Sequence, residues 1–415
     1  MRKLLLAALL FQSVNAFGQT VGAEIASGSI PFTNVSSFLP TPAVALAKDR
    51  TGVAIAWLMP GTDGDRISVV RLDATGHFTG QVQTIPIASS ELVYVVSPSI
   101  AAAPRGDGFT LVWLEIVSTS PPVTRAVYCR LDRDLKPSTP AVLLVIRQAV
   151  TAPAVVRSGK TTWISAGASV WELRDDGSLG EPLNAGINAT DMTVATDFPQ
   201  IVGRDQVLGT PFTCDKLPGC SAASAGPFRG FCIETCRKFQ STYLLRFTSL
   251  FSISASKSFD FESNAAPAIR GDGRDVALVW LQGARDKEGD VVMTRLLPPS
   301  FTDFATSVNQ LRVIGSFGPD AGPTRPDIAT DGERYVVVWR TSVGEGAHDI
   351  VGTSIDRAGN IVPLSIATTS ADERDPSVVS MGDGTFLVAY EKLSGGQRQI
   401  AGKFVMFESR ARAVR

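Results

Sequence analysis

A single order of apolar and polar positions recurs along the chain. It starts at a proline, passes through a short apolar run and a polar turn with glycine, and ends in a continuous apolar run closed by an aromatic residue. The clearest copy, TRPDIATDGERYVVVWR, covers Thr324 to Arg340. The same order returns at Pro42 to Trp57, Pro98 to Trp113, Pro267 to Trp280 and Pro376 to Tyr390. Such self-similarity indicates a repeat architecture, in which each unit buries its apolar faces against its neighbours.

The apolar runs within a repeat are short and are separated by turn signals. In the first repeat they predict strands at Ala43 to Ala47, Val53 to Leu58, Arg66 to Leu72 and Val82 to Ile87. Short β-rich runs with turns at regular spacing are typical of all-β proteins. No segment between turns combines the length of a helix with its period of about 3.6 residues. We therefore predict an all-β fold.

The starts of the repeats lie roughly 40 to 75 residues apart, with the excess length in loops. Four strands in a period of about 40 to 50 residues are typical of propeller blades. We predict a seven-bladed β-propeller with four-stranded antiparallel blades in one domain, residues 19–415. Its blades start at Pro42, Pro98, Pro153, Met192, Pro267, Pro326 and Pro376.

Residue size within the repeat agrees with this geometry. The innermost strand faces a narrow axis and carries small residues such as Ala45 and Ala329. The second strand is covered on both faces by neighbouring blades, so it is a continuous apolar run rather than an alternating one. Trp57, Trp113 and Trp339 lie at the end of this run, where a large flat side chain can fill the gap between wedge-shaped blades.

The seventh repeat has three strands before the chain ends, and its fourth is missing. A strand-like run at Ile30 to Val35 precedes the first repeat and resembles a fourth strand without the other three. We predict that this N-terminal strand joins the last blade and closes the ring, because closure removes two exposed sheet edges at once.

The repeated block P-x-I-A-x-x-G-x-x-[FY]-x-V-x-W is followed by I-x-x-x-x-[IV]-D-x-x-G, as in Ile350 to Gly359. Together these motifs resemble the repeats of secreted bacterial β-propeller proteins, and the resemblance covers most of the mature chain. It implies the fold. It implies no particular activity, because the propeller fold carries many functions.

The first residues are typical of a targeting segment. Met1 to Lys3 is positively charged, Leu4 to Phe11 is apolar but too short to span a bilayer, and Val14 to Ala16 offers a small-residue cleavage site. We predict a signal peptide at residues 1–18 and a secreted or periplasmic, monomeric protein without a membrane span. The formal net charge of −1 argues against a nucleic-acid partner, which would require a basic surplus.

Four of the five cysteines gather in an insertion at about residues 210–240. In an oxidising compartment they indicate two disulfides, and we favour the nested pairing of Cys214 with Cys236 and Cys220 with Cys232. A four-cysteine zinc site is the alternative, although the C-x5-C and C-x3-C spacings fit it poorly. Cys129 stands in an apolar run and is predicted to be a buried thiol. We expect no metal and no cofactor.

Charged residues at the strand entries and nearby loops are predicted to meet at the mouth of the central channel. Converging carboxylates and guanidiniums can bind a sugar, a carboxylate or a cation, whereas ion pairs between blades are the structural alternative. Asp65, Arg340, Asp349 and Arg398 lie on or beside the same rim. The predicted ligand-binding residues are Asp191, Arg325, Asp327, His348, Arg374 and Asp375.

Candidate catalytic residues are few. The chain has two histidines, and no nucleophile-elbow, P-loop or dinucleotide motif occurs in a strand–turn–helix context. We therefore expect an exported, non-enzymatic module that recognises a glycan, a peptide or an envelope partner on its channel face. A hydrolase or lyase that acts on extracellular polysaccharide through rim carboxylates is the alternative, so enzymatic activity is left open. A structural part of a surface assembly is a third possibility.

Overall fold

The computed structural model describes the chain as antiparallel β-sheets. The residues described are 19–26, 44–59, 66–73, 75–87, 92–103, 108–117, 123–147, 153–158, 161–184, 189–194, 199–208, 241–249, 252–260, 267–272, 274–282, 288–296, 311–319, 325–344, 347–395 and 397–408. Within these ranges the regular elements are strands, as the repeat pattern predicts, and no helix is long and apolar enough to cross a membrane.

Seven sheets form from these strands, and we number them in chain order. Sheet 1 holds β3 (Val44–Lys48), β4 (Gly52–Met59), β5 (Arg66–Asp73) and β6 (Phe78–Ile85). Sheet 2 holds β7 (Leu92–Ala102), β8 (Gly108–Val117), β9 (Val123–Asp132) and β10 (Val142–Arg147). Sheet 3 holds β11 (Ala154–Ser158), β12 (Thr161–Ala166), β13 (Ser169–Leu173) and β14 (Leu183–Asn184).

The second half of the chain continues in the same way. Sheet 4 holds β15 (Ala189–Val194), β16 (Pro199–Leu208), β17 (Ser241–Ser249) and β18 (Ser252–Asp260). Sheet 5 holds β19 (Ala268–Gly271), β20 (Val276–Gln282), β21 (Gly289–Leu296) and β22 (Arg312–Phe317). Sheet 6 holds β23 (Asp327–Thr330), β24 (Arg334–Gly344), β25 (Ala347–Asp356) and β26 (Ile361–Ala367). Sheet 7 holds β27 (Asp372–Gly382), β28 (Thr385–Ser394) and β29 (Gln397–Phe407), together with β1 (Gln19–Val21) and β2 (Ile25–Ala26).

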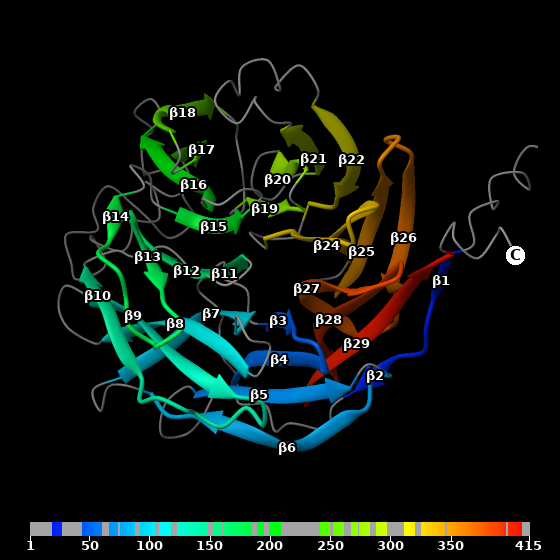
Figure 1. Cartoon of the computed structure of the whole chain (residues 1–415). Coiled ribbons are helices and arrows are strands. Elements are labelled where there is room, and N and C mark those ends of the chain that lie inside the picture. The colour runs from blue at the N-terminus through cyan, green and yellow to red at the C-terminus, as the bar shows by residue number, and fades with distance from the viewer. Residues whose placement is uncertain are drawn as a thin grey trace, which may run out of the picture.

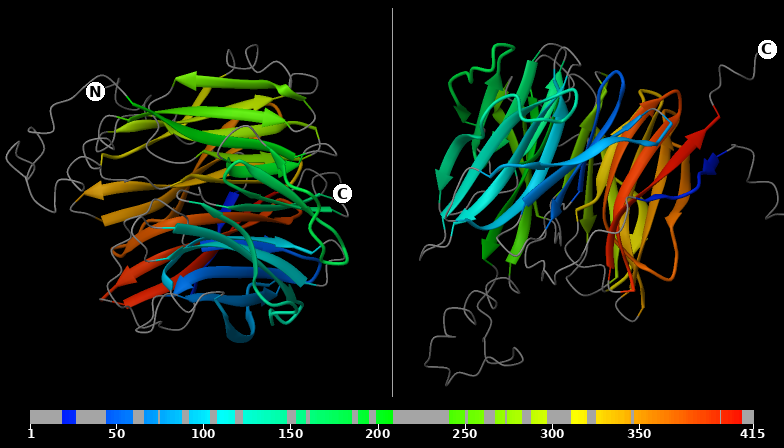
Figure 2. Two further views of the ribbon diagram at one scale, coloured as in Figure 1. Left: turned by 90° about the vertical axis from the view of Figure 1, so that its left-hand side faces the viewer. Right: turned by 90° about the horizontal axis from the view of Figure 1, so that it is seen from below.

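The sheets are arranged around a central axis, with the first strand of each sheet nearest to it (Figure 1). First strands of consecutive sheets contact each other, from β3 with β7 through to β23 with β27, and β27 also contacts β3. Viewed from the side, the strands of each sheet run side by side across the thickness of the molecule (Figure 2). This is the arrangement of a β-propeller.

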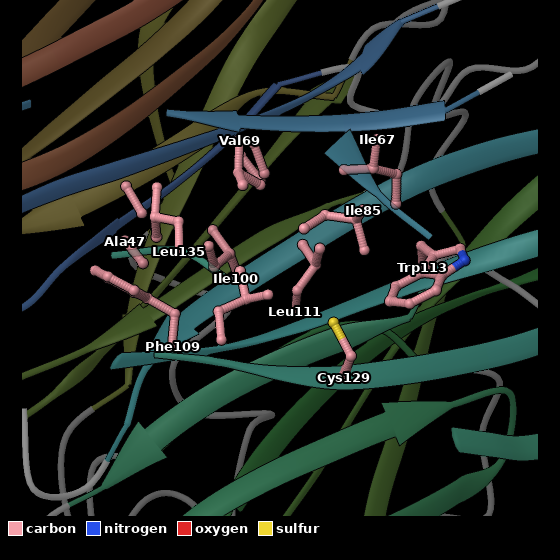
Figure 3. Packing of buried hydrophobic residues seen from close by; sticks show 14 of the residues in the cluster. Ala47, Ile67, Val69, Ile85, Ile100, Phe109, Leu111, Trp113, Cys129 and Leu135 are labelled. Carbon is pink, nitrogen blue, oxygen red and sulfur yellow. The ribbon is translucent and has the colours of Figure 1, made fainter. Parts of the chain in front are cut away.

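Apolar side chains fill the space between neighbouring sheets. Between sheets 1 and 2, Ile67 and Ile85 face Leu111 and Trp113, and all four are at most 2% exposed (Figure 3). Full burial of a large apolar side chain contributes roughly 1.5–3 kcal/mol, so these interfaces dominate the stability of the fold. Second strands such as β4 and β20 are therefore buried on both faces, as their continuous apolar sequences predict.

The tryptophan that closes the repeat fills a gap between sheets, as predicted. Trp339 of sheet 6 is 3% exposed and packs in one cluster with Val291 and Met293 of sheet 5. It also lies directly over Gly315, where an added Cβ would come within 2.4 Å of the indole ring. A side chain at position 315 would therefore push the two sheets apart.

The motif D-x-x-G forms a turn between the third and fourth strands. In sheet 6 the carbonyl oxygen of Asp356 accepts from Gly359 N–H at 3.0 Å, and its carboxylate accepts from Asn360 N–H at 2.9 Å. The fourth residue has a positive φ, which glycine adopts without strain. The residues at this position are Gly76, Leu135, Gly177 and Gly359.

Leu135 is the non-glycine exception among these turns, with a φ of 63°. Its side chain is 1% exposed and belongs to the core between sheets 1 and 2. The left-handed conformation costs a non-glycine residue about 1–2 kcal/mol, whereas full burial of leucine contributes about 1.5–3 kcal/mol. Burial therefore outweighs the backbone strain at this position.

The same turns connect neighbouring sheets. An arginine on the third strand of one sheet donates from Nη1 to a backbone carbonyl oxygen in the turn of the next sheet. The pairs are Arg71 with Arg133 at 2.6 Å, Arg130 with Asp175 at 3.2 Å, and Arg295 with Arg357 at 3.4 Å.

The N-terminal segment pairs with the last strand of the chain, through residues that precede the run predicted from the sequence. Gln19–Val21 and Ile25–Ala26 both pair antiparallel with β29, whereas residues 30–35 lie outside the described part of the chain. Between the two short strands, Glu24 accepts from the Tyr390 hydroxyl at 2.8 Å and pairs with Lys392 at 2.7 Å. The segment is therefore attached through both its backbone and a side chain.

We expect deletion of residues 1–26 to lower the melting temperature by several degrees, because it exposes the edge of β29 and leaves Lys392 without Glu24. Differential scanning calorimetry measures this change. The substitution Ala23→Ser, at an exposed position between β1 and β2, is the control and should melt like the parent protein. Equal melting of the deletion variant and the parent would show that the pairing with β29 contributes little.

Candidate functional site

Polar side chains on the first strands join neighbouring sheets around the axis. Ser99, Asp191, Thr193 and Asp327 each accept a hydrogen bond from a backbone N–H of the next sheet's first strand. These N–H groups face the adjacent sheet, and an unpaired one would carry the desolvation cost of a buried donor. We call these four residues the axial belt.

Three of the predicted ligand-binding residues belong to the belt or pair with it. Asp191 is 5% exposed, accepts from Ile269 N–H at 2.8 Å and forms an ion pair with Arg325. Asp327 accepts from Ser377 Oγ and Val378 N–H, both at 2.9 Å. Asp191, Arg325 and Asp327 therefore make contacts that join neighbouring sheets. This agrees with the alternative to ligand binding, in which such residues form ion pairs between blades.

The other three predicted residues lie together at one edge of sheets 6 and 7, where first strands begin and second strands end. Asp372, Arg374 and Asp375 come from the start of β27, Arg340 and Glu391 from the ends of β24 and β28, and His348 and Arg398 from the starts of β25 and β29. We call these seven residues the sheet 6–7 cluster.

His348 is part of this cluster rather than a solvated loop residue. It lies in β25 and is 6% exposed, and its Nδ1 is 2.7 Å from Asp372 Oδ1. The other oxygen of Asp372 is 2.5 Å from Nη2 of Arg374. One carboxylate therefore holds the imidazole and the guanidinium in a fixed relative position.

Asp375 has an unusual backbone. Its φ of 48° lies in the left-handed region, and it falls in an irregular part of β27 where the pairing with β28 breaks between Arg374 and Ser377. Burial raises the pKa of its carboxyl, while the positive charges of Arg340, Arg398 and Arg374 act to lower it. Strained residues at a strand bulge are frequent at functional sites.

Charges in the cluster are largely matched. Arg398 pairs with Glu391, which is 5% exposed, and the charge of Arg340 acts on Asp375. Burial acts to raise the pKa of Asp372, but hydrogen bonds from Arg374 and His348 outweigh it and hold the pKa below its ordinary value of 3.8. The result is an alternation of donors and acceptors rather than a surface of one sign.

Two further carboxylates lie beside the cluster, and their pKa values are raised, unlike that of Asp372. Burial raises the pKa of Asp349, and burial likewise raises the pKa of Glu373. Glu373 is fully buried and accepts from the Thr369 hydroxyl at 2.5 Å. A buried carboxyl with a raised pKa is the kind of group that can act as a general acid.

The sequence indicated most of this cluster but not all of it. The sequence predicts Arg340, Asp349 and Arg398 on or beside the rim, and the structure brings them to the same edge as His348. Asp372 and Glu391 were not identified. Asp372 lies two residues before Arg374 on the same strand and so on the same face, a signal that was available.

The cysteine predictions are tested only at Cys129. This thiol is 1% exposed and is not in a disulfide, and burial raises its pKa to about 12, so the predicted buried thiol is confirmed. Cys214, Cys220, Cys232 and Cys236 lie outside the described residues, as does Asp65. Among the described residues, no group of three or more His, Cys, Asp or Glu side chains could hold a metal ion.

With sheets arranged like blades around an axis, the chain is a β-propeller repeat protein. No family model matches the chain, and no curated protein matches it. Similar solved structures include a protein of unknown function from Dyadobacter fermentans, at 12% identity over 94% of this chain and 100% of that chain, with a TM-score of 0.46.

Two further similar structures are named as propeller or WD40 domains. The β-propeller domain of the trilobed protease from Pyrococcus furiosus is 8% identical, over 86% of this chain and 97% of that chain, with a TM-score of 0.43. The WD40 domain of coronin from Toxoplasma gondii is 9% identical, over 95% and 87%, with a TM-score of 0.48. Likenesses this distant assign no activity.

We expect Asp372→Asn to lower the melting temperature at neutral pH, because the amide cannot pair with Arg374 and His348. A carboxylate whose folded pKa is depressed stabilises the fold above its unfolded pKa and loses that contribution as the pH falls through the folded pKa. The difference between variant and parent should therefore persist at neutral pH and narrow as the pH falls from about 4 towards about 2.

Calorimetry across this pH range makes the measurement, and Asp134→Asn in an exposed turn is the control. A melting difference that stays constant with pH would mean that the charge of Asp372 is not responsible.

Proposed function

We propose that the chain is an exported, non-enzymatic binding protein that recognises a glycan at the sheet 6–7 cluster. Its scaffold is a single seven-bladed propeller, closed where the N-terminal strands join sheet 7. The contact of β27 with β3 and the pairing of β1 and β2 with β29 support the closure.

One observation carries the proposal: the cluster offers paired guanidiniums and carboxylates side by side, with part of the set open to solvent. The side chains of Arg374 and Asp372 are 34% and 19% exposed, whereas those of Arg398 and Glu391 behind them are 10% and 7% exposed. A sugar hydroxyl both donates and accepts, so it can bond a guanidinium and a carboxylate at once.

Burying so many ion pairs is not an efficient way to stabilise a fold. Replacement of a buried ion pair by apolar residues is often neutral or stabilising, because desolvation opposes the Coulomb attraction. Sheets 1 and 2 are joined by apolar packing, although buried ion pairs also occur between sheets 5 and 6. A dense charged cluster with a strained aspartate at one edge is therefore better explained by ligand binding than by stability.

We expect Arg374→Ala to reduce binding of a neutral oligosaccharide by about tenfold to a hundredfold, the range for loss of a hydrogen bond to a charged group. A glycan array with the purified full-length protein identifies the oligosaccharide, and isothermal titration calorimetry measures its affinity for both proteins. Arg50→Ala, at an exposed turn of sheet 1, is the matched control and should bind like the parent. Unchanged binding by Arg374→Ala would contradict the assignment of the site.

The second candidate function is a polysaccharide hydrolase or lyase that uses rim carboxylates. The observation in its favour is that burial raises the pKa of Asp349, Glu373 and Asp375, as suits a proton donor. A reducing-end release assay on the glycans bound in the array separates the two functions. Release that Asp375→Asn abolishes would favour the enzyme, whereas binding without release supports the binding protein.

A further inference from the structure

A second candidate site lies between sheets 5 and 6, at the edge opposite the sheet 6–7 cluster. It is a cavity of about 260 Å³. It is lined by Met293, Thr294, Arg295, Arg312, Ile314, Ile355, Arg357 and Gly359. The two sites lie near opposite ends of β25, at His348 and Ile355, and at about 3.3 Å per residue they are roughly 23 Å apart.

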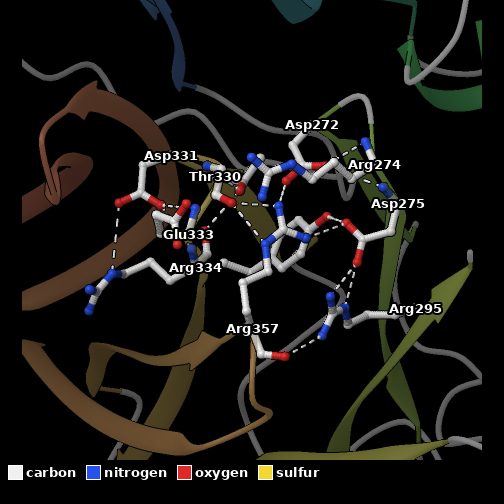
Figure 4. A network of polar contacts seen from close by, with 11 residues as sticks. Asp272, Arg274, Asp275, Arg295, Thr330, Asp331, Glu333, Arg334 and Arg357 are labelled. Atoms are coloured by element: carbon white, nitrogen blue, oxygen red, sulfur yellow. Dashed lines mark hydrogen bonds and ion pairs between the residues drawn. The ribbon is translucent and has the colours of Figure 1, made fainter. Parts of the chain in front are cut away.

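Three guanidinium groups line this cavity, and its described lining includes no carboxylate. Behind the lining, the buried carboxylate of Asp275 fixes two of them: Arg295 Nε is 2.6 Å from Oδ2 and Arg357 Nη1 is 3.0 Å from Oδ1 (Figure 4). Asp272 also pairs with Arg357, and the Tyr335 hydroxyl donates to Asp275 at 2.5 Å. These two arginines are therefore held rigidly before any ligand arrives.

The third guanidinium has a weaker partner. Arg312 is exposed and donates from Nη1 to the carbonyl oxygen of Gly359 at 3.0 Å, which is a neutral acceptor. The nearby carboxylate of Asp356 accepts from the backbone and side chain of Asn360 in its own turn. Arg312 can accordingly turn one edge of its planar fork towards an anion in the cavity.

The remaining wall is apolar and buried. Met293, Ile314 and Ile355 are 3%, 5% and 2% exposed, so each presents only a small apolar surface to the cavity. A polar anion alone would leave this small apolar surface without an apolar partner. A ligand with a short apolar chain would cover it, at about 25 cal/mol per Å² of apolar surface buried, which is a modest addition to the contact with Arg312.

We propose that this cavity binds a small carboxylate with a short apolar chain. The carboxylate pairs with the fork of Arg312 at the opening, and the apolar chain lies against Met293, Ile314 and Ile355. A cavity of this volume is below the usual range of about 300–1,000 Å³ for drug-sized ligands, so it suits a smaller molecule. The site is independent of glycan binding at the sheet 6–7 cluster.

Isothermal titration calorimetry of the full-length protein with hexanoate tests the proposal. We expect saturable binding of hexanoate, and affinity lower by about tenfold for hexanamide, which has the same shape but no charge. Inorganic phosphate, which has charge but no apolar body, should also bind more weakly than hexanoate. Equal affinity for hexanoate and either of the other probes would overturn the proposal, as would the absence of hexanoate binding.

Two variants locate the binding. Arg312→Gln should weaken hexanoate binding by about tenfold, the loss expected for one charge-assisted contact, without lowering the melting temperature. Arg274→Gln, at an exposed arginine that does not line the cavity, is the matched control and should bind hexanoate like the parent. Hexanoate binding that is unchanged in Arg312→Gln, or equally weakened in both variants, would place the ligand elsewhere.

Discussion

Each sheet of this protein has two apolar faces, and only the sheets beside it can cover them. That requirement explains the continuous apolar second strand, the tryptophans between sheets and the absence of a side chain at Gly315 beneath Trp339. A second requirement, the pairing of sheet edges, explains why the N-terminal strands pair with sheet 7. The last sheet has three strands of its own, and β29 would otherwise be an open edge.

Polar side chains make two kinds of contact where the first strands begin. Near the axis, side chains such as Asp191 and Asp327 accept backbone N–H groups of the next sheet, so they serve the contact between sheets. Where β27 begins, sheets 6 and 7 bring matched charges together around Asp375, whose φ of 48° is in the left-handed region. The first set of contacts is explained by the fold, whereas the second set is the basis of the proposed binding site.

Much of the architecture could be predicted from the sequence because its causes are local. Strand position, the turn glycines and the buried tryptophans depend on residue size and spacing within one repeat. The pairing of Gln19–Val21 with β29 was not predicted, since the choice of a distant partner strand is not encoded locally, whereas Ile30 to Val35 lies outside the described residues. The contact of His348 with Asp372 could not be predicted for a similar reason, because Asp372 comes from the next sheet.

The arginine contacts between sheets have one more consequence. Arg71, Arg130 and Arg295 each reach a backbone oxygen of the following turn rather than a side chain. The residue that supplies that oxygen can be basic, as Arg133 is, or acidic, as Asp175 is, without loss of the bond. Adjacent units can thus diverge in composition while the contact between them persists, which allows a series of unlike repeats to acquire different chemistry in different sheets.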